Sequence, residues 1–313
     1  MSRILIVGAG AVGGYFGARL AQAGRDVTFL VRHPRAAILR EHGLRIHTPD
    51  GTIERIDAKT VTADAVDAAY DLVLLAVKGY ALDAAIRDIT PAIGPATIIV
   101  PVLNGITHIA ALADQFGADH VYGGVCIVAT ALDAQGDIVQ LNQLQKLSWG
   151  PLDGRSADRL DDVSALLTWA GFDAEPSTTI LHDMWEKWVF LASLGAITCL
   201  MRGTIGDVNA APRGRDFALD ILGEAADVAA AAGFAPREPF LSDIRRTVTE
   251  PRSALTSSMY RDLIASRPVE GDHILGALVD EGARHRVPTP LLALAHTSLS
   301  VYTAQRDSRR PMG

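Results

Sequence analysis

The sequence contains few cysteines and no hydrophobic run that is long enough, and free enough of charge, to suggest a membrane span. Its only cysteines, Cys126 and Cys199, lie far apart and lack the close spacing of metal ligands. We therefore expect two buried free thiols, no metal site, and a reducing compartment such as the cytoplasm. The apolar stretch 188–201 has 14 uncharged residues, whereas a bilayer needs about 20. This stretch predicts a buried helix and no membrane partner.

An excess of positive charge is also missing. The 313 residues include 29 Lys and Arg against 36 Asp and Glu, which gives a formal net charge of −7. This balance argues against nucleic acid or an anionic membrane as a partner. Apolar residues make up 49% and charged residues 21%, as in ordinary globular proteins. A chain of this length favours two hydrophobic cores over one.

The first thirty residues carry the most informative pattern. An apolar run (3–7) leads into GAGAVG (8–13), a helical stretch (14–23) and a second apolar run (27–31). This order is typical of the dinucleotide-binding βαβ unit. Gly8 permits the tight turn, Gly10 lets the backbone approach a pyrophosphate, and Gly13 lets the helix pack closely on the sheet. The amides of Ala11 and Val12 then face the phosphates at the helix N-terminus. The alternative is a glycine-rich turn that binds nothing.

An acid is missing where an NAD site usually has one. Asp or Glu at the end of the second strand normally bonds the ribose 2′-hydroxyl, but here Arg32 follows the strand. A guanidinium suits a 2′-phosphate, which a carboxylate would repel. We therefore predict that the cofactor is NADP(H). The alternative is that Arg32 is only a surface charge.

The order of predicted elements indicates two domains. Alternating strands and helices predict an α/β, Rossmann-type NADP-binding domain over residues 1–178, in which ligands bind outside the carboxyl ends of the strands. The rest predicts an all-α substrate and catalytic domain over 179–313. The expected strands are 3–7, 27–31, 44–48, 52–56, 71–77, 97–102 and 172–175, with antiparallel strands between 121 and 150. The expected helices are 14–23, 34–41, 81–89, 108–116, 157–169, 181–202, 213–232, 238–247, 257–265, 273–285 and 290–304.

Five polar residues are candidates for the substrate site. Lys78 and Asn104 each end an apolar run, at the carboxyl end of a predicted strand. Lys187 lies between two tryptophans on an apolar helix, where partial desolvation makes an ammonium a readier proton donor. Ser258 and Glu270 precede helical stretches. The simpler interpretations are polar strand ends, a lysine that snorkels to the surface, a helix cap and a carboxylate near a helix N-terminus.

With these residues assembled, the chain resembles the ketopantoate reductase family over essentially its full length. The matching features are GAGAVG, Arg32, Lys78, the Asn104–Gly105 pair, Trp185-x-Lys187, and Ser257-Ser258-Met259-x-x-Asp262 followed by Arg267 and Glu270. The resemblance implies NADPH-dependent reduction of a 2-keto acid, with 2-dehydropantoate to pantoate, a step of pantothenate biosynthesis, as the favoured reaction. It also implies a small-molecule partner and a monomer or homodimer.

The resemblance assigns a role to each candidate residue. Lys187 is the general acid, and Glu270 holds the lysine and the substrate in position. Asn104 and Ser258 bind substrate, and Lys78 lies near both nicotinamide and substrate. Asn104 also counts among the expected cofactor contacts. A proton donor fits the chemistry, because hydride addition to a ketone creates an alkoxide.

Three positions depart from the family pattern. Family members often carry asparagine where this chain has Leu191, Gly195 and Leu255. The resemblance implies that those amides contact the polar end of the substrate. A buried hydroxyl that faces leucine instead would lose roughly 1–3 kcal/mol. The substrate is therefore either 2-dehydropantoate held by other groups or a less polar 2-keto acid. A third alternative, from a different class, is a non-catalytic NADPH-binding sensor.

Overall fold

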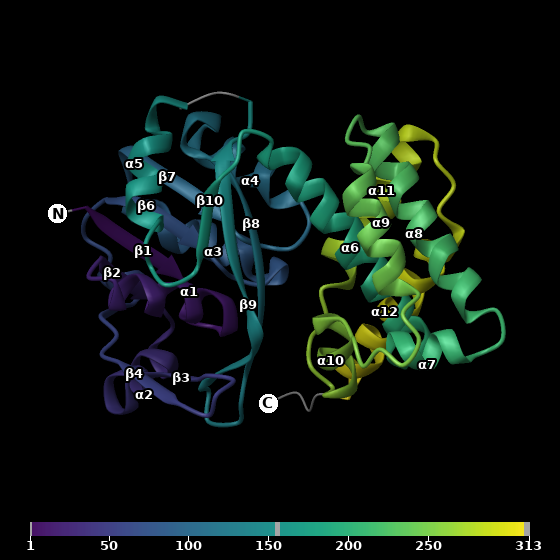
Figure 1. The fold of residues 1–313 in the computed structure, drawn as a ribbon. Coiled ribbons are helices and arrows are strands. Elements are labelled where there is room, and N and C mark those ends of the chain that lie inside the picture. Colours follow the sequence, from purple (N-terminus) through teal and green to yellow (C-terminus); the bar gives the residue numbers. More distant parts are fainter. Residues whose placement is uncertain (1, 154–156, 310–313) are drawn as a thin grey trace. The chain divides into compact units, whose positions relative to one another are not determined.

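A computed structural model describes residues 2–153 and 157–309 of the chain (Figure 1). The described residues divide into two compact units. Unit 1 comprises residues 1–103 and 108–181, and unit 2 comprises residues 104–107 and 182–313. The short stretch 104–107 therefore packs with the second half of the chain, although it follows a strand of unit 1 in the sequence. The expected α/β fold followed by helices is confirmed.

Unit 1 is built on a parallel five-stranded sheet with the order β5-β2-β1-β6-β7. Its strands read as apolar runs because helices cover both faces of such a sheet. In β1, Ile4, Leu5 and Ile6 are fully buried. The strands are β1 (Arg3–Val7), β2 (Asp26–Leu30), β5 (Thr60–Val61), β6 (Tyr70–Leu75) and β7 (Ile93–Pro101). The two-residue β5 was not predicted.

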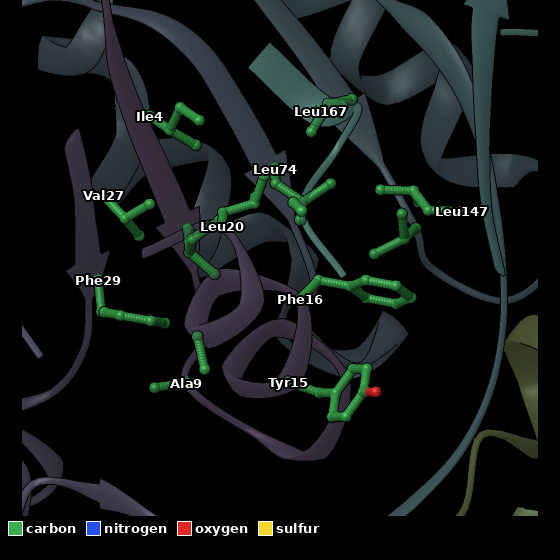
Figure 2. Close-up of a cluster of buried hydrophobic side chains, with 14 of the residues drawn as sticks. Ile4, Ala9, Tyr15, Phe16, Leu20, Val27, Phe29, Leu74, Leu147 and Leu167 are labelled. Carbon is green, nitrogen blue, oxygen red and sulfur yellow. The ribbon is translucent and has the colours of Figure 1, made fainter. Parts of the chain in front are cut away.

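The helices of unit 1 are α1 (Ala11–Gln22), α2 (His33–His42), α3 (Leu82–Ile89), α4 (Thr107–Phe116) and α5 (Leu160–Leu167). Helix α1 packs tightly on the sheet because Gly17 has no side chain. A Cβ at Gly17 would lie 2.5 Å from the ring of Phe29 on β2. Figure 2 shows the resulting core, in which Leu20 of α1 lies among Ile4, Val27 and Leu74 of the strands. The ring of Phe16 extends to the other side and packs edge-on against Phe172.

A second sheet completes unit 1, with the order β10-β9-β3-β4 and β8 paired to β9. Its strands are β3 (Leu44–His47), β4 (Ile53–Ile56), β8 (Tyr122–Leu132), β9 (Ile138–Pro151) and β10 (Asp173–Pro176). Strands β3 and β4 form the hairpin expected around Gly51, and β8 and β9 form the antiparallel pair expected around Gly136. Both glycines have positive φ, +88° and +82°, which explains why the turns lie there.

Unit 2 is helical. Its elements are α6 (Ile180–Met201), α7 (Ile205–Ala210), α8 (Gly214–Ala231), α9 (Glu238–Val248), α10 (Ser258–Ile264), a π-helical segment (Asp272–Gly276), α11 (Ala277–His285) and α12 (Pro290–Ser308). Helix α7 and the π-helical segment were not predicted. Helix α7 begins with a capping box, because Thr204 and Asp207 bond each other's backbone amides.

Helix α6 has 22 residues and is longer than its uncharged stretch. By length and hydropathy alone it is the one described helix that could cross a membrane. Within the chain, however, 72% of its most apolar window is buried. The core helix of a globular domain passes the same test, so this feature is weak evidence for a membrane span.

Candidate functional site

The glycine turn of unit 1 has the shape of a phosphate cradle. Gly8 adopts φ +95°, and a Cβ at Gly13 would lie 2.2 Å from the carbonyl oxygen of Gly8, so both positions require glycine. A Cβ at Gly10 would meet no heavy atom within 4 Å, its chain neighbours apart. The turn is therefore tight on its inner side and open at Gly10. This is the arrangement that lets a ligand approach the backbone.

Backbone donors stand at the open side of this turn. Helix α1 begins at Ala11, and Gly14 N donates to Gly10 O at 2.8 Å as the first turn closes. The amides of Ala11, Val12 and Gly13 precede that bond, where an α-helix offers donors to an external acceptor. The first turn of α1 carries no acidic side chain. These features favour an anion at this position, and they fit the pyrophosphate of a dinucleotide.

The strand register places two predicted residues beside the turn. Val7 at the end of β1 pairs with Leu30 of β2 and with Leu75 of β6. The segments that follow these three strands therefore leave the same edge of the sheet. Arg32 lies just past β2 at the start of α2, and Lys78 lies just past β6. Both residues were expected near the strand ends, although Lys78 lies three residues beyond the end of β6 at the start of a 3₁₀ turn.

Arg32 and Lys78 differ in exposure. The Arg32 side chain is exposed, and within residues 2–153 and 157–309 no hydrogen bond or ion pair engages it. A guanidinium of this kind can bind a phosphate without giving up another partner. Lys78 is half-buried and interacts with other groups of the chain.

Arg35 contacts the glycine turn, a role that the sequence reasoning missed. Its Nη2 donates to the carbonyl oxygen of Ala9 at 3.1 Å, while its Nε is buried and has no hydrogen-bond partner. Burial lowers the pKa of this guanidinium, and the nearby charge of Asp137 acts in the opposite direction. Arg35 is thus a second cation at the turn, three residues after Arg32. That spacing on one helix face was the available signal.

In unit 2, Asn104 and Glu270 come together from distant parts of the sequence. The Nδ2 of Asn104 lies 3.5 Å from Oε2 of Glu270, a long hydrogen bond. Glu270 is 5% exposed and Asn104 is half-buried. A buried carboxylate needs donors around it, and an amide beside it is one of them. These two predicted residues therefore share one site.

The indole of Trp188 ties this site to α6. Its Nε1 donates to the carbonyl oxygen of Ile274, inside the π-helical segment, at 2.9 Å. Gly105 lies close to both segments. It adopts φ +76°, and a Cβ at this position would lie only 2.9 Å from the carbonyl oxygen of His273. Segments of π-helix frequently occur at functional sites. Asn104, Glu270 and the residue next to Lys187 are thus connected through a few contacts.

On α6, Lys187 lies between Trp188 and Glu186, a buried carboxylate that is paired with the partly exposed Arg237. It is half-buried and interacts with other groups of the chain. The preceding residue, Glu186, is 5% exposed and accepts hydrogen bonds from Arg237, at 2.8 Å from the backbone N and 2.9 Å from Nε. Arg237 also bonds Asp183 through Nη2. Lys187 is therefore flanked on α6 by two residues whose side chains are fixed by hydrogen bonds.

The two adjacent serines have different roles. Ser257 is buried and caps α10, because its Oγ accepts a hydrogen bond from the amide of Tyr260 at 2.9 Å. Ser258 is exposed and begins the helix. The capping role therefore belongs to Ser257. Ser258, in contrast, is exposed at the first position of the helix and stays a predicted substrate contact.

One group of described residues has the composition of a metal site. His47, Asp133 and Asp137 offer ligand atoms within 4.8 Å of one another. Asp137, however, accepts hydrogen bonds from Arg45 at 2.9 Å and lies 3.1 Å from His47 Nε2. Asp133 caps the β8–β9 turn by accepting from the amides of Gln135 and Asp137. These bonds show that the cluster stabilises the hairpin, and the positive charge of Arg45 on Asp137 opposes the binding of a cation.

Comparison with known proteins assigns the chain to a family. The family model for ketopantoate reductase PanE/ApbA matches residues 4–154, and the model for its C-terminal domain matches residues 179–303. An uncharacterized oxidoreductase of Bacillus subtilis, YkpB, is 33% identical, covering 97% of this chain and 100% of its own length. The 2-dehydropantoate 2-reductase of Mesorhizobium japonicum is 27% identical over 93% of this chain and 94% of its own.

A solved structure agrees with these matches. The 2-dehydropantoate 2-reductase of Geobacter metallireducens has a TM-score of 0.86 and 27% identity, covering 96% of this chain and 99% of that chain. The resemblance drawn from the motifs is therefore confirmed. The chain belongs to the ketopantoate reductase (PanE/ApbA) family of oxidoreductases.

Proposed function

We propose that this protein reduces a 2-keto acid to the corresponding 2-hydroxy acid with NADPH. The observation that carries the proposal is that one chain contains both an open glycine turn followed by Arg32, in unit 1, and the group Lys187, Asn104 and Glu270, in unit 2. Reduction of 2-dehydropantoate to pantoate, in pantothenate biosynthesis, is the reaction to assay first, because several relatives are named for it.

Residues of unit 1 hold the cofactor in this proposal. The amides of Ala11, Val12 and Gly13 bind the pyrophosphate, and Gly8 and Gly10 keep the backbone clear for it. Arg32 binds the 2′-phosphate, and Lys78 lies on the nicotinamide side. When bound, NADPH supplies the hydride. In this proposal, the domain of residues 1–178 binds the cofactor, and the domain of residues 179–313 transfers the proton.

Residues of unit 2 act on the substrate. The Lys187 ammonium attracts the keto acid, protonates the carbonyl oxygen and stabilises the negative charge that develops there. Glu270 and Asn104 orient the lysine and the substrate, and Ser258 binds the substrate from the start of α10. Asn104 also stays a predicted cofactor contact. A monomer or homodimer in the cytoplasm remains our expectation.

Two substitutions test the chemistry. We expect Lys187→Ala to lower kcat at least a hundredfold, the scale of general acid catalysis, while NADPH affinity stays within about twofold. Lys187→Arg should keep much of the substrate binding through its charge, yet recover little of kcat. Lys146→Ala, which removes a surface lysine paired with Glu175, is the control. Unchanged turnover in Lys187→Ala would refute the mechanism.

A third substitution tests the cofactor. Arg32→Ala should weaken NADPH binding about tenfold or more and leave NADH binding nearly unchanged, because only NADPH carries the 2′-phosphate. Fluorescence titration of both nucleotides measures the two affinities. Equal losses for the two nucleotides would contradict the assignment of NADP(H).

A further inference from the structure

The face of α6 beyond Lys187 is apolar. Leu191 lies one turn after Lys187, and Gly195 lies a further turn along. Leu255, which precedes α10, is half-buried like Leu191, so both leucines leave part of their hydrocarbon accessible. From this surface we infer that the protein prefers 2-keto acids whose side chain is a branched or aromatic hydrocarbon without a hydroxyl group. The inference rests on the proposed function.

A methionine fills the space beside Gly195. An ideal Cβ at Gly195 would lie 2.5 Å from Cε of Met259, so any side chain at position 195 requires Met259 to move. Met259 is 3% exposed, which leaves it little room to do so. Met259 lies on α10, one position after Ser258. The surface beyond Lys187 is therefore closed by a methyl group, with no polar side chain at position 195.

Three hydroxyl groups near this surface, those of Ser193, Thr198 and Ser257, are engaged within the protein. Thr198 Oγ1 donates to the carbonyl oxygen of Leu194 at 2.6 Å and lies 2.9 Å from Ser257 Oγ, which therefore donates to it. Ser257 Oγ accepts from the amide of Tyr260. Ser193 Oγ donates to its own helix at Val189 O, at 2.7 Å. Each hydroxyl has a single proton, so none of these three has one left for a substrate.

Leu255 is held in place by its backbone. Its amide bonds Ser253 Oγ at 3.2 Å, and its carbonyl oxygen accepts from the amide of Ile205 at 3.0 Å. The amide of Gly206 also bonds Ser253 O at 2.8 Å. These contacts anchor the segment to the start of α7. A hydroxyl on the substrate would meet hydrocarbon at Leu191 and Leu255, and leaving it unpaired would lower kcat/KM by about 5- to 150-fold.

Two substrates that differ by one atom provide the test. 2-Dehydropantoate and 3,3-dimethyl-2-oxobutanoate share the keto acid and the branched carbon, and only the former carries the terminal hydroxyl. With NADPH, we expect the 313-residue protein to show at least a fivefold higher kcat/KM for 3,3-dimethyl-2-oxobutanoate. Equal or better use of 2-dehydropantoate overturns the inference and leaves the proposed function standing. Failure to oxidise NADPH with either one, or with phenylpyruvate, overturns both.

A substitution locates the cause of the preference. Leu255→Asn supplies an amide and should shift the kcat/KM ratio at least fivefold towards 2-dehydropantoate, mainly through a lower KM for that substrate. Leu294→Asn changes an exposed leucine on α12, 54% exposed, and should leave the ratio unchanged. A ratio that responds equally to both substitutions, or to neither, contradicts the assignment of Leu255 to the substrate surface. Circular dichroism confirms that both variants fold.

Discussion

Replacement of Arg237 by methionine is expected to destabilise unit 2, because it leaves Glu186 buried without its charged partner. Glu186 is 5% exposed on α6, and three donors of Arg237 contact it: the backbone N, Nε and Nη2. The hydrogen bond with Glu186 is the main reason that the pKa of Arg237 is raised. The substitution keeps the backbone donor and the hydrophobic stem but removes both guanidinium donors.

The size of the effect follows from burial. Removing one partner of a fully buried pair costs about 3–5 kcal/mol. The Arg237 side chain is 48% exposed, so water can reach the outer side of the carboxylate after truncation. We therefore expect a loss of about 2–3 kcal/mol. At roughly 2–4 °C per kcal/mol for domains of this size, the melting temperature of unit 2 should fall by about 4–12 °C.

Urea unfolding followed by tryptophan fluorescence measures this loss, since Trp185 and Trp188 lie on the same helix as Glu186. The control is Arg246→Met, whose partner Asp243 is exposed, and we expect a change within about 0.5 kcal/mol. Replacing Glu186 and Arg237 together by methionine should recover part of the stability, because no uncompensated charge remains. A loss of stability in Arg237→Met no larger than that in Arg246→Met would contradict this expectation.

Three further predictions concern unit 1 and the thiols. Gly10→Ala should weaken NADPH binding at least tenfold, as measured by nucleotide titration, without lowering the melting temperature. Gly13→Ala should lower the melting temperature, because its Cβ would lie 2.2 Å from Gly8 O; an unchanged melting temperature in Gly13→Ala would contradict this. Burial raises the pKa of Cys199 to about 12, so in a Cys126→Ser background its thiol should react with a disulfide reagent at pH 8 roughly 10³-fold more slowly than a free cysteine; a rate near that of free cysteine would contradict this. Burial acts to raise the pKa of Asp137, but hydrogen bonds from His47 and Arg45 outweigh it and hold the pKa below its ordinary 3.8. The ionised Asp137 therefore stabilises the fold above pH 3.8, and this stabilisation is lost as the pH falls through the lowered pKa of its carboxyl group. Asp137→Asn should cost about 1–2 kcal/mol at pH 7, and the difference from wild type in urea midpoint should shrink below pH 3.8; a constant difference would be evidence against it.

Local patterns were sufficient for the cofactor half. The strand Arg3–Val7 was predicted with its observed ends, because its apolar run is interrupted by a glycine that must adopt positive φ. The helix that follows begins at Ala11, three residues before its predicted start, because Gly13 and Gly14 lie inside the helix. Glycine lowers helix propensity, and here close packing overrides that preference.

Features that depend on packing between distant segments were not predictable. Helix α7 has six residues, too few for an amphipathic period to show, and its Thr204-x-x-Asp207 cap was the available signal. The π-helical segment packs closely on α12. A Cβ at Gly271 would lie 3.2 Å from Leu299, and a Cβ at Gly276 would lie 2.8 Å from His296, both on α12. No local pattern shows which glycines will meet another helix. The same holds for Met259 beside Gly195.

These packing features bear directly on the proposed proton donor. Lys187 has Glu186 on one side, held by Arg237, and Trp188 on the other, held by the carbonyl oxygen of Ile274. Both bonds connect α6 to segments more than 50 positions away in the sequence, at separations of 51 and 86. Two such restraints fix the rotation of the helix at Lys187, and a proton donor must be held to within a fraction of an ångström to act efficiently. Trp188 therefore helps to hold α6 in position, and the Glu186–Arg237 ion pair does the same from the residue on the other side of Lys187 in the sequence.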